Sequence, residues 1–337
     1  MTAADLLAFR ARFPWLTGDL QTVRNTALDR LGQGPKPPAG APRRLEIPCK
    51  DGTGDRLLAL LDEPARSMAA TGGGAAADGL VLLLHGLTGC EDSPYMRATA
   101  RLLVQAGRRV VRLNLRGAGP SRATCGQHYH AGRGGDVAIA IAGLAAAGIG
   151  EVRVAVGYSL GASILLNHLA DVGTATPLKL AMAVSAPLDL MATSICMQRP
   201  RNRVYQAAIL ADMKRELRGS AAPEALTAAA LKSRTVRGFD NALIAPWNGF
   251  GTVERYYSQC SAAPRLGAIG VDTLLVHAAD DPWIPLSMYR AVDWAGLPRL
   301  QPCLFAGGGH VGFHQAGHAA PAHDRVLLRR LGGNVAS

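Results

Sequence analysis

The sequence predicts an α/β fold in which helices cover both faces of a mostly parallel sheet. Short apolar runs alternate with helical patterns from residue 80 onward, as in strands joined by right-handed crossovers. A glycine-rich turn, GYSLG at 157–161, joins one such run to a helical pattern. Two β-capable runs around the DGTG turn at 51–54 have the pattern of an antiparallel hairpin, which would add strands at one edge of the sheet.

The chain has 337 residues, enough for one large domain with an insertion. We expect an N-terminal arm and linker at 1–42, a core at 43–186 and 263–337, and a helical cap insertion at 187–262. Before residue 80 we expect a helix at 2–13, strands at 44–48 and 56–61 and a low-complexity loop at 65–79. The alternating part should contain a strand at 80–84, a helix at 94–106, a strand at 109–113, a helix at 137–147, a strand at 152–156 with a helix from Ala162, and a strand at 178–184. After it we expect cap helices at 204–217 and 223–233 followed by a turn-rich piece, strands at 273–277 and 301–305, and a closing helix from about Ala320.

The formal net charge is +11, carried almost entirely by arginine. These arginines are spread along the chain, with no run beyond pairs such as Arg108-Arg109. Because no nucleic-acid-binding signature accompanies them, we expect a solvated basic surface and no nucleic-acid partner. Peripheral contact with a membrane stays open.

Six scattered cysteines without metal-ligand spacing are typical of free thiols in a reducing compartment. No apolar run approaches the roughly 18 residues of a membrane helix, and the N-terminus lacks the apolar core of a secretory signal. We therefore expect a cytoplasmic protein.

The turn at 157–161 has the pattern of a nucleophile elbow, because a strand precedes it and a helix follows it. Glycines at its ends let the backbone fold sharply. Such a turn would lift Ser159 above the sheet at the N-terminus of a helix. A capping serine in an ordinary glycine-rich turn is the plainer alternative.

A nucleophilic serine needs a base and an acid that orients the base. Among nine histidines, only His310 follows the last predicted strand on a glycine-rich loop, and it is the candidate base. We expect His277 to be a core residue of a strand; His314, His318 and His323 fall in the terminal segment.

The candidate acid follows the penultimate strand, where two aspartates are adjacent. Asp281 is favoured because it stands four residues before Pro285, and Asp280 is the reserve. The order Ser–Asp–His is that of α/β-hydrolases. The oxyanion would be held by the backbone N–H groups of Leu160 and Leu87, with His85 supporting the Leu87 loop through hydrogen bonds.

The sequence gives little indication of a metal site or a nucleotide-binding site. His128 and His130 form an H-x-H pair, but no third ligand lies at metal-binding spacing. No dinucleotide-binding glycine pattern and no P-loop occur. We expect neither a metal nor a cofactor.

Several segments together resemble the YheT-type α/β-hydrolases, relatives of the animal abhydrolase-domain lipases. The matching pieces, in family order, are LQT at 20–22, HGLTG at 85–89, SPY at 93–95, NLRG at 114–117, YHAG at 129–132, GYSLGA at 157–162, GF at 249–250, YY at 256–257, AADDP at 278–282 and GGHVGF at 308–313. The chain departs from the pattern at Gly18-Asp19, where relatives often have a histidine, and at Ala118 in place of a cysteine.

The resemblance implies an α/β-hydrolase fold, a triad of Ser159, Asp281 and His310, and esterase or acylglycerol-lipase activity. We therefore expect a serine carboxylic-ester hydrolase acting on a small-molecule or lipid ester. Acyl transfer to an alcohol would use the same acyl-enzyme and stays open. A non-catalytic ligand-binding protein is a third possibility, since fold alone does not define function. The acyl-chain length, the alcohol part and the oligomeric state are not indicated.

Overall fold

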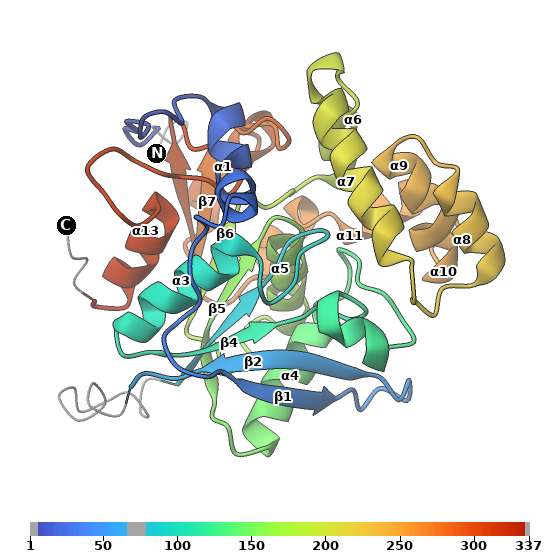
Figure 1. Ribbon diagram of the computed structural model, residues 1–337, viewed down its shortest axis with the longest axis horizontal. Coiled ribbons are helices and arrows are strands. Elements are labelled where there is room, and N and C mark those ends of the chain that lie inside the picture. Colours follow the sequence, from blue (N-terminus) through green and yellow to red (C-terminus); the bar gives the residue numbers. More distant parts are fainter. Residues whose placement is uncertain (1–5, 66–78, 334–337) are drawn as a thin grey trace.

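We describe the protein from a computed structural model, which describes residues 6–65 and 79–333. An eight-stranded sheet forms the centre of the molecule, in the order β1-β2-β4-β3-β5-β6-β7-β8 (Figure 1). The strands are β1 (Arg43–Pro48), β2 (Arg56–Asp62), β3 (Leu80–Leu84), β4 (Arg109–Leu113), β5 (Val152–Tyr158), β6 (Leu180–Val184), β7 (Thr273–Ala278) and β8 (Leu300–Phe305). The predicted α/β fold with a mostly parallel sheet is confirmed.

The antiparallel part of the sheet is the predicted hairpin. β1 pairs with β2, and β2 pairs antiparallel with β4, whereas every pair from β4 to β8 is parallel. The chain leaves β3 to one side for β4 and later returns to its other side for β5. In open α/β sheets, ligands bind at the carboxyl ends of the strands on either side of such a reversal, here β3 and β5.

Helices pack on both faces of the sheet because each presents an apolar stripe to it. On one face lie α3 (Pro94–Gln105) and α13 (Ala322–Arg330), whose buried side chains join one apolar cluster. On the other lie α4 (Gly134–Ala146) and α5 (Leu160–Val172), which join a second cluster with the hairpin.

Between β6 and β7 the chain forms a separate group of helices, the inserted helices of residues 187–262, at the right of Figure 1. Their bounds are α6 (Leu190–Met197), α7 (Arg203–Glu216), α8 (Glu224–Leu231), α9 (Val236–Phe239), α10 (Ala245–Trp247) and α11 (Val253–Cys260). They have an apolar cluster of their own. The expectation of a turn-rich piece after α8 is wrong over most of its length, because 239–247 and α11 are helical. Thr252 caps α11 by accepting from Arg255 N–H at 3.3 Å.

The helix predicted at 2–13 is also wrong over the part that the structure describes. Residues 6–13 are extended, and Leu7 N–H donates to Leu304 O at 2.6 Å beside β8. The free edge of β8 supplies backbone partners that a helix would not use, so tertiary pairing overrides the local apolar pattern. Residues 1–5, and nearly all of the loop predicted at 65–79, lie outside the described residues.

An unpredicted helix, α1 (Gly18–Arg30), follows the arm. Thr17 caps it by accepting from Leu20 N–H at 3.3 Å. Its buried residues are only Gly18 and Gln21, so an apolar face packed on the core does not account for this helix.

Candidate active site

Ser159 lies at the turn between β5 and α5. Its backbone has φ 51° and ψ −120°, a conformation that residues other than glycine rarely adopt. The turn closes tightly, since a Cβ added at Gly157 would lie 2.5 Å from Gly161 O, and one added at Gly161 would lie 2.3 Å from His85 O. The sharp turn therefore requires glycine on both sides of the serine.

The structure brings Ser159, His310 and Asp281 into one line of hydrogen bonds. His310 Nε2 lies 2.9 Å from Ser159 Oγ, and His310 Nδ1 lies 2.8 Å from Asp281 Oδ2. These distances suit proton transfer from the serine to a histidine whose other nitrogen is held by a carboxylate.

Asp281 has three hydrogen-bond partners, His310 and two backbone N–H groups. Its Oδ1 accepts from Trp283 N–H at 2.8 Å and from Ile284 N–H at 3.0 Å. Burial on its own raises the pKa of Asp281, but attraction to His310 and these hydrogen bonds lower it below its ordinary value. Its charge is therefore stable beside the imidazole.

Asp280 is directed elsewhere. Its Oδ1 accepts from Gly309 N–H at 2.8 Å, so this carboxyl shapes the loop that carries His310 and does not contact the imidazole nitrogens. The geometry therefore favours Asp281 over Asp280 as the partner of His310.

His277 is a core residue, as predicted. It is fully buried, stacks on Tyr289 with ring centroids 4.1 Å apart, and has a pKa lowered by burial to about 4. Its Nδ1 lies 4.0 Å from Asp281 Oδ2, which places an uncharged ring behind the acid.

Helix α1 holds the His310 loop, a contact that the sequence analysis did not foresee. His310 N–H donates to Thr22 Oγ1 at 2.8 Å, and Thr22 Oγ1 donates to Gly18 O at 2.7 Å. Gln21 forms a double bridge to His314, with Oε1 accepting from N–H at 2.8 Å and Nε2 donating to the carbonyl at 3.0 Å. The polar side chains of the LQT segment, which only the family resemblance singles out, therefore hold this loop in place.

The loop after β3 lies directly against the serine, since a Cβ added at Gly86 would be 3.1 Å from Ser159 Cβ. Gly86 N–H donates to Tyr95 Oη at 2.9 Å, and Thr88 N–H donates to Tyr129 Oη at 2.8 Å. Leu87, whose N–H is the predicted oxyanion donor, lies between these two engaged groups. Leu160 is the first residue of α5, where backbone N–H groups have no partner within the helix.

His85 supports this loop through hydrogen bonds, as predicted. Its Nδ1 donates to Gly86 O at 2.8 Å and its Nε2 accepts from Leu115 N–H at 3.0 Å. Burial lowers the pKa of His85 to about 4, so the ring is neutral near pH 7 and keeps both contacts.

Tyr129 connects the same loop to the inserted helices. Its hydroxyl accepts from Thr88 N–H and donates to Glu216 Oε2 at 2.9 Å, at the end of α7. Burial raises the pKa of Glu216 to about 7, although Arg122 lies 3.6 Å from its other oxygen. Apart from the YHAG segment, no sequence pattern indicates this contact.

A chain of aromatic rings leads from His310 to the surface. Trp283 lies 4.3 Å from His310 between ring centroids, and Tyr205 of α7 lies 5.5 Å from Trp283. Tyr205 Oη donates to Asp19 Oδ1 at 3.1 Å, so α1 and α7 meet beside the triad.

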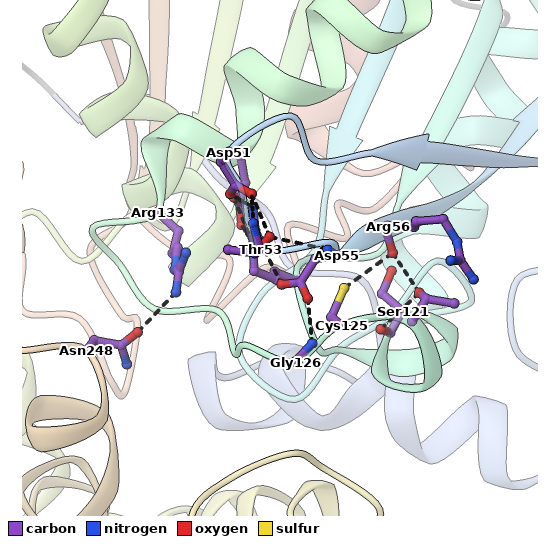
Figure 2. Close-up of polar contacts among 12 residues, drawn as sticks. Asp51, Thr53, Asp55, Arg56, Ser121, Cys125, Gly126, Arg133 and Asn248 are labelled. Carbon is purple, nitrogen blue, oxygen red and sulfur yellow. Dashed lines mark hydrogen bonds and ion pairs between the residues drawn. The ribbon is translucent and has the colours of Figure 1, made fainter.

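A buried cation explains the NLRG segment. Arg116 is fully buried and pairs with Asp51 and Asp55 at 2.7 Å and with Asp136 at 2.6 Å. Figure 2 shows the turn residues gathered beside Gly126, whose N–H donates to Asp55 at 2.6 Å. These bonds tie the hairpin to α4.

A polar cavity of about 580 Å³ opens next to this cluster, lined in part by Asp51, His130 and Arg133. Arg133 donates to Asn248 at 3.2 Å across it (Figure 2). The residues that line it do not include the triad.

The H-x-H pair packs on aromatic rings. His128 stacks on Trp247 at 6.2 Å, and His130 meets Phe250 edge-on at 5.2 Å. Burial lowers the pKa of both to about 3. Within 6–65 and 79–333, no three histidine, cysteine, aspartate or glutamate side chains are grouped as metal ligands.

The fold and this geometry define a class of protein. Residues 79–316 match the family described as alpha/beta hydrolase fold, and the chain belongs to that family. It is 32% identical over 277 residues to the protein named "Putative esterase YheT" of Escherichia coli, covering 80% of this chain and 78% of that one. The predicted resemblance to YheT-type hydrolases is confirmed.

A second relative is the mouse protein named phospholipase ABHD3, 28% identical over 237 residues; the match covers 69% of this chain and 58% of the relative's length. Among solved structures, an esterase of Pyrococcus furiosus, Pf2001, superposes with a TM-score of 0.54 at 16% identity, over 88% of this chain and 98% of that one. The latter likeness supports the fold alone.

In the described part of the chain, no helix combines the length and apolar character that crossing a bilayer requires.

Proposed function

We propose that the protein is a serine carboxylic-ester hydrolase that acts through an acyl-enzyme on Ser159. The observation that carries this proposal is the line of hydrogen bonds from Ser159 Oγ through His310 to Asp281. Membership of a family that includes proteins named as esterases and phospholipases agrees with it.

In the proposed reaction, His310 Nε2 takes the proton of Ser159 as its Oγ attacks the ester carbonyl. The N–H groups of Leu87 and Leu160 stabilise the oxyanion; loss of one such donor typically costs about 2.7–4 kcal/mol of transition-state stabilisation. His310 then gives its proton to the leaving alcohol. Water attacks the acyl-enzyme with His310 again as the base, which frees the acid and restores Ser159.

Asp281 would keep Nδ1 protonated and stabilise the imidazolium that forms when His310 takes a proton. Its lowered pKa fits this role, because the carboxylate stays ionised throughout the cycle. Trp283 covers the imidazole on one side and would limit its contact with water.

The inserted helices at 187–262 would act as a cap over an apolar acyl site. Leu87 and Leu160, on which the oxyanion donors lie, pack their side chains against the apolar cluster of these helices. Met191 of α6 packs against the same cluster. An acyl chain leaving the carbonyl carbon would therefore meet apolar side chains from both sides.

The test is hydrolysis of p-nitrophenyl esters of increasing acyl length by the wild type and by Ser159→Ala. We expect turnover that falls by about a thousandfold or more in the variant, while its far-UV circular dichroism is unchanged. Comparable activity in both proteins would contradict the proposal. Adding a primary alcohol and measuring the ester formed distinguishes acyl transfer from hydrolysis at the same acyl-enzyme.

A further inference from the structure

Two segments of the surface expose large apolar side chains. Of the nine exposed large apolar residues in the described part of the chain, seven lie within 6–20 and 195–204. Phe13 and Val204 are 80% exposed, Leu16 is 56% exposed and Ile195 is 54% exposed. Such clustering of apolar side chains in water marks an interaction surface.

The two segments are neighbours in space. Arg201 pairs with Asp19 at 2.9 Å, and Tyr205 Oη donates to the same carboxylate. In Figure 1 the arm and α1 (blue) and the protruding tip between α6 and α7 (yellow) all lie along the upper edge of the molecule. We name this surface, residues 6–20 and 195–204, the arm–tip face.

The arm–tip face is also strongly basic. It contains five arginines, two within 6–20 and three within 195–204, and one carboxylate, Asp19. The five arginines are all exposed: Arg10, Arg12, Arg199, Arg201 and Arg203. Asp19 is paired with Arg201 at 2.9 Å.

We propose that the arm–tip face docks the protein on a lipid surface that carries anionic headgroups. Arginines that flank exposed apolar side chains match such a surface, because headgroup charge attracts the cations while the apolar side chains enter the acyl boundary. A nucleic acid would use the arginines but would leave most of the aliphatic side chains, Leu16, Ile195 and Val204 among them, in water.

The face adjoins the candidate active site. Tyr205 follows Val204, and its ring leads through Trp283 to His310. A docked bilayer would therefore lie beside the catalytic histidine, a consequence that rests on the proposed function; the docking itself does not.

The experiment is co-sedimentation of the full chain with phosphatidylcholine vesicles, with and without about one third phosphatidylglycerol. One variant combines Arg199→Gln and Arg203→Gln, which leaves the Arg201–Asp19 ion pair intact. A second combines Phe13→Ser and Val204→Ser. The matched control combines Arg218→Gln and Leu231→Ser, an exposed cation and an exposed apolar residue elsewhere on the inserted helices.

We expect the wild type to bind the anionic vesicles and to bind phosphatidylcholine alone weakly. Each face variant should lose about tenfold or more in affinity, whereas the control and Ser159→Ala should bind like the wild type. All variants except Ser159→Ala should hydrolyse a short soluble ester at the wild-type rate, so a failed hydrolase proposal would not affect the binding result.

No binding by the wild type, or equal loss in the control, would overturn the proposal. So would binding to the anionic vesicles that survives Phe13→Ser with Val204→Ser but is competed by single-stranded DNA, since this would identify a general polyanion site.

Discussion

Thr22 Oγ1 accepts a hydrogen bond from the backbone N–H of His310 at 2.8 Å, between residues 288 positions apart in the chain. The same hydroxyl donates to Gly18 O within α1. Helix α1 therefore helps to hold the loop after β8 that carries the imidazole. Since proton transfer depends on small distances, this contact positions the proposed base.

Replacing Thr22 by valine keeps the side-chain volume and removes the acceptor. An unsatisfied buried N–H costs about 1–3 kcal/mol, so we expect the His310 loop to shift and kcat to fall by about tenfold or more. The control is Thr22→Ser, which retains the hydroxyl and should retain most of the activity. Equal kcat in the wild type and Thr22→Val would show that the contact does not position His310.

The two adjacent aspartates differ in their contacts, which gives a matched pair of variants. Asp281→Asn should lower kcat by about four orders of magnitude, because an amide favours the wrong tautomer of His310. Asp280→Asn keeps an oxygen that can accept from Gly309 N–H and should retain more than about a tenth of the activity. Steady-state kinetics of both variants on one ester checks this; the reverse order would make Asp280 the acid.

The residues of this site that could be predicted from the sequence are those whose pattern is local in the chain. Those that could not be predicted depend on contacts between distant segments. Ser159 depends on a local pattern, because strand, glycine turn and helix follow one another in the chain. His310 can be predicted for the same reason, because the last strand and the glycine-rich loop that follows it are adjacent in the chain. Two contacts could not be predicted: the hydrogen bonds of Thr22 and Gln21 to the His310 loop, and the contact between Tyr129 and Glu216. Each joins segments far apart in the chain, and the spacing of apolar residues does not indicate such pairs.

In the N-terminal arm, a local pattern predicted the wrong structure. Its apolar spacing fits an amphipathic helix, yet residues 6–13 pair with the edge of the sheet beside β8. Conversely, α1 forms although few of its side chains are buried, because a cap and polar contacts to the His310 loop hold it. Local propensity gave way to tertiary partners in both cases.

Tyr129→Phe would remove the acceptor of Thr88 N–H in the loop that carries Leu87. We expect kcat to fall by about tenfold with little change in KM, because the loop would then hold the oxyanion donor less firmly. Tyr256→Phe is the control: its hydroxyl also accepts a backbone N–H, from Ala131 at 3.1 Å, but outside this loop. Equal effects of the two variants on kcat would argue against a role in the oxyanion site.

Glu216 should make stability depend on pH. Its pKa is raised from 4.5 to about 7, so the folded state binds the proton more tightly than the unfolded chain. Its stabilising contribution is therefore complete below pH 4.5 and is lost as the pH rises to about 7, by up to about 3 kcal/mol.

Glu216→Gln should abolish this component. The difference in melting temperature, variant minus wild type, should rise between pH 4.5 and pH 7.5 and level off above the folded-state pKa. The difference is needed because buried histidines such as His128, with a pKa lowered to about 3, act in the opposite sense: their contribution is lost as pH falls below 6.5. A difference that is constant with pH would contradict the raised pKa.

Covalent trapping tests whether Ser159 carries the acyl group. The protein is treated with a fluorophosphonate, and the adduct is located by peptide mass spectrometry in parallel with ester hydrolysis. We expect a single adduct on Ser159, loss of activity in proportion to labelling, and no adduct in Ser159→Ala. An unlabelled Ser159 in a protein that still hydrolyses esters would contradict the proposed mechanism.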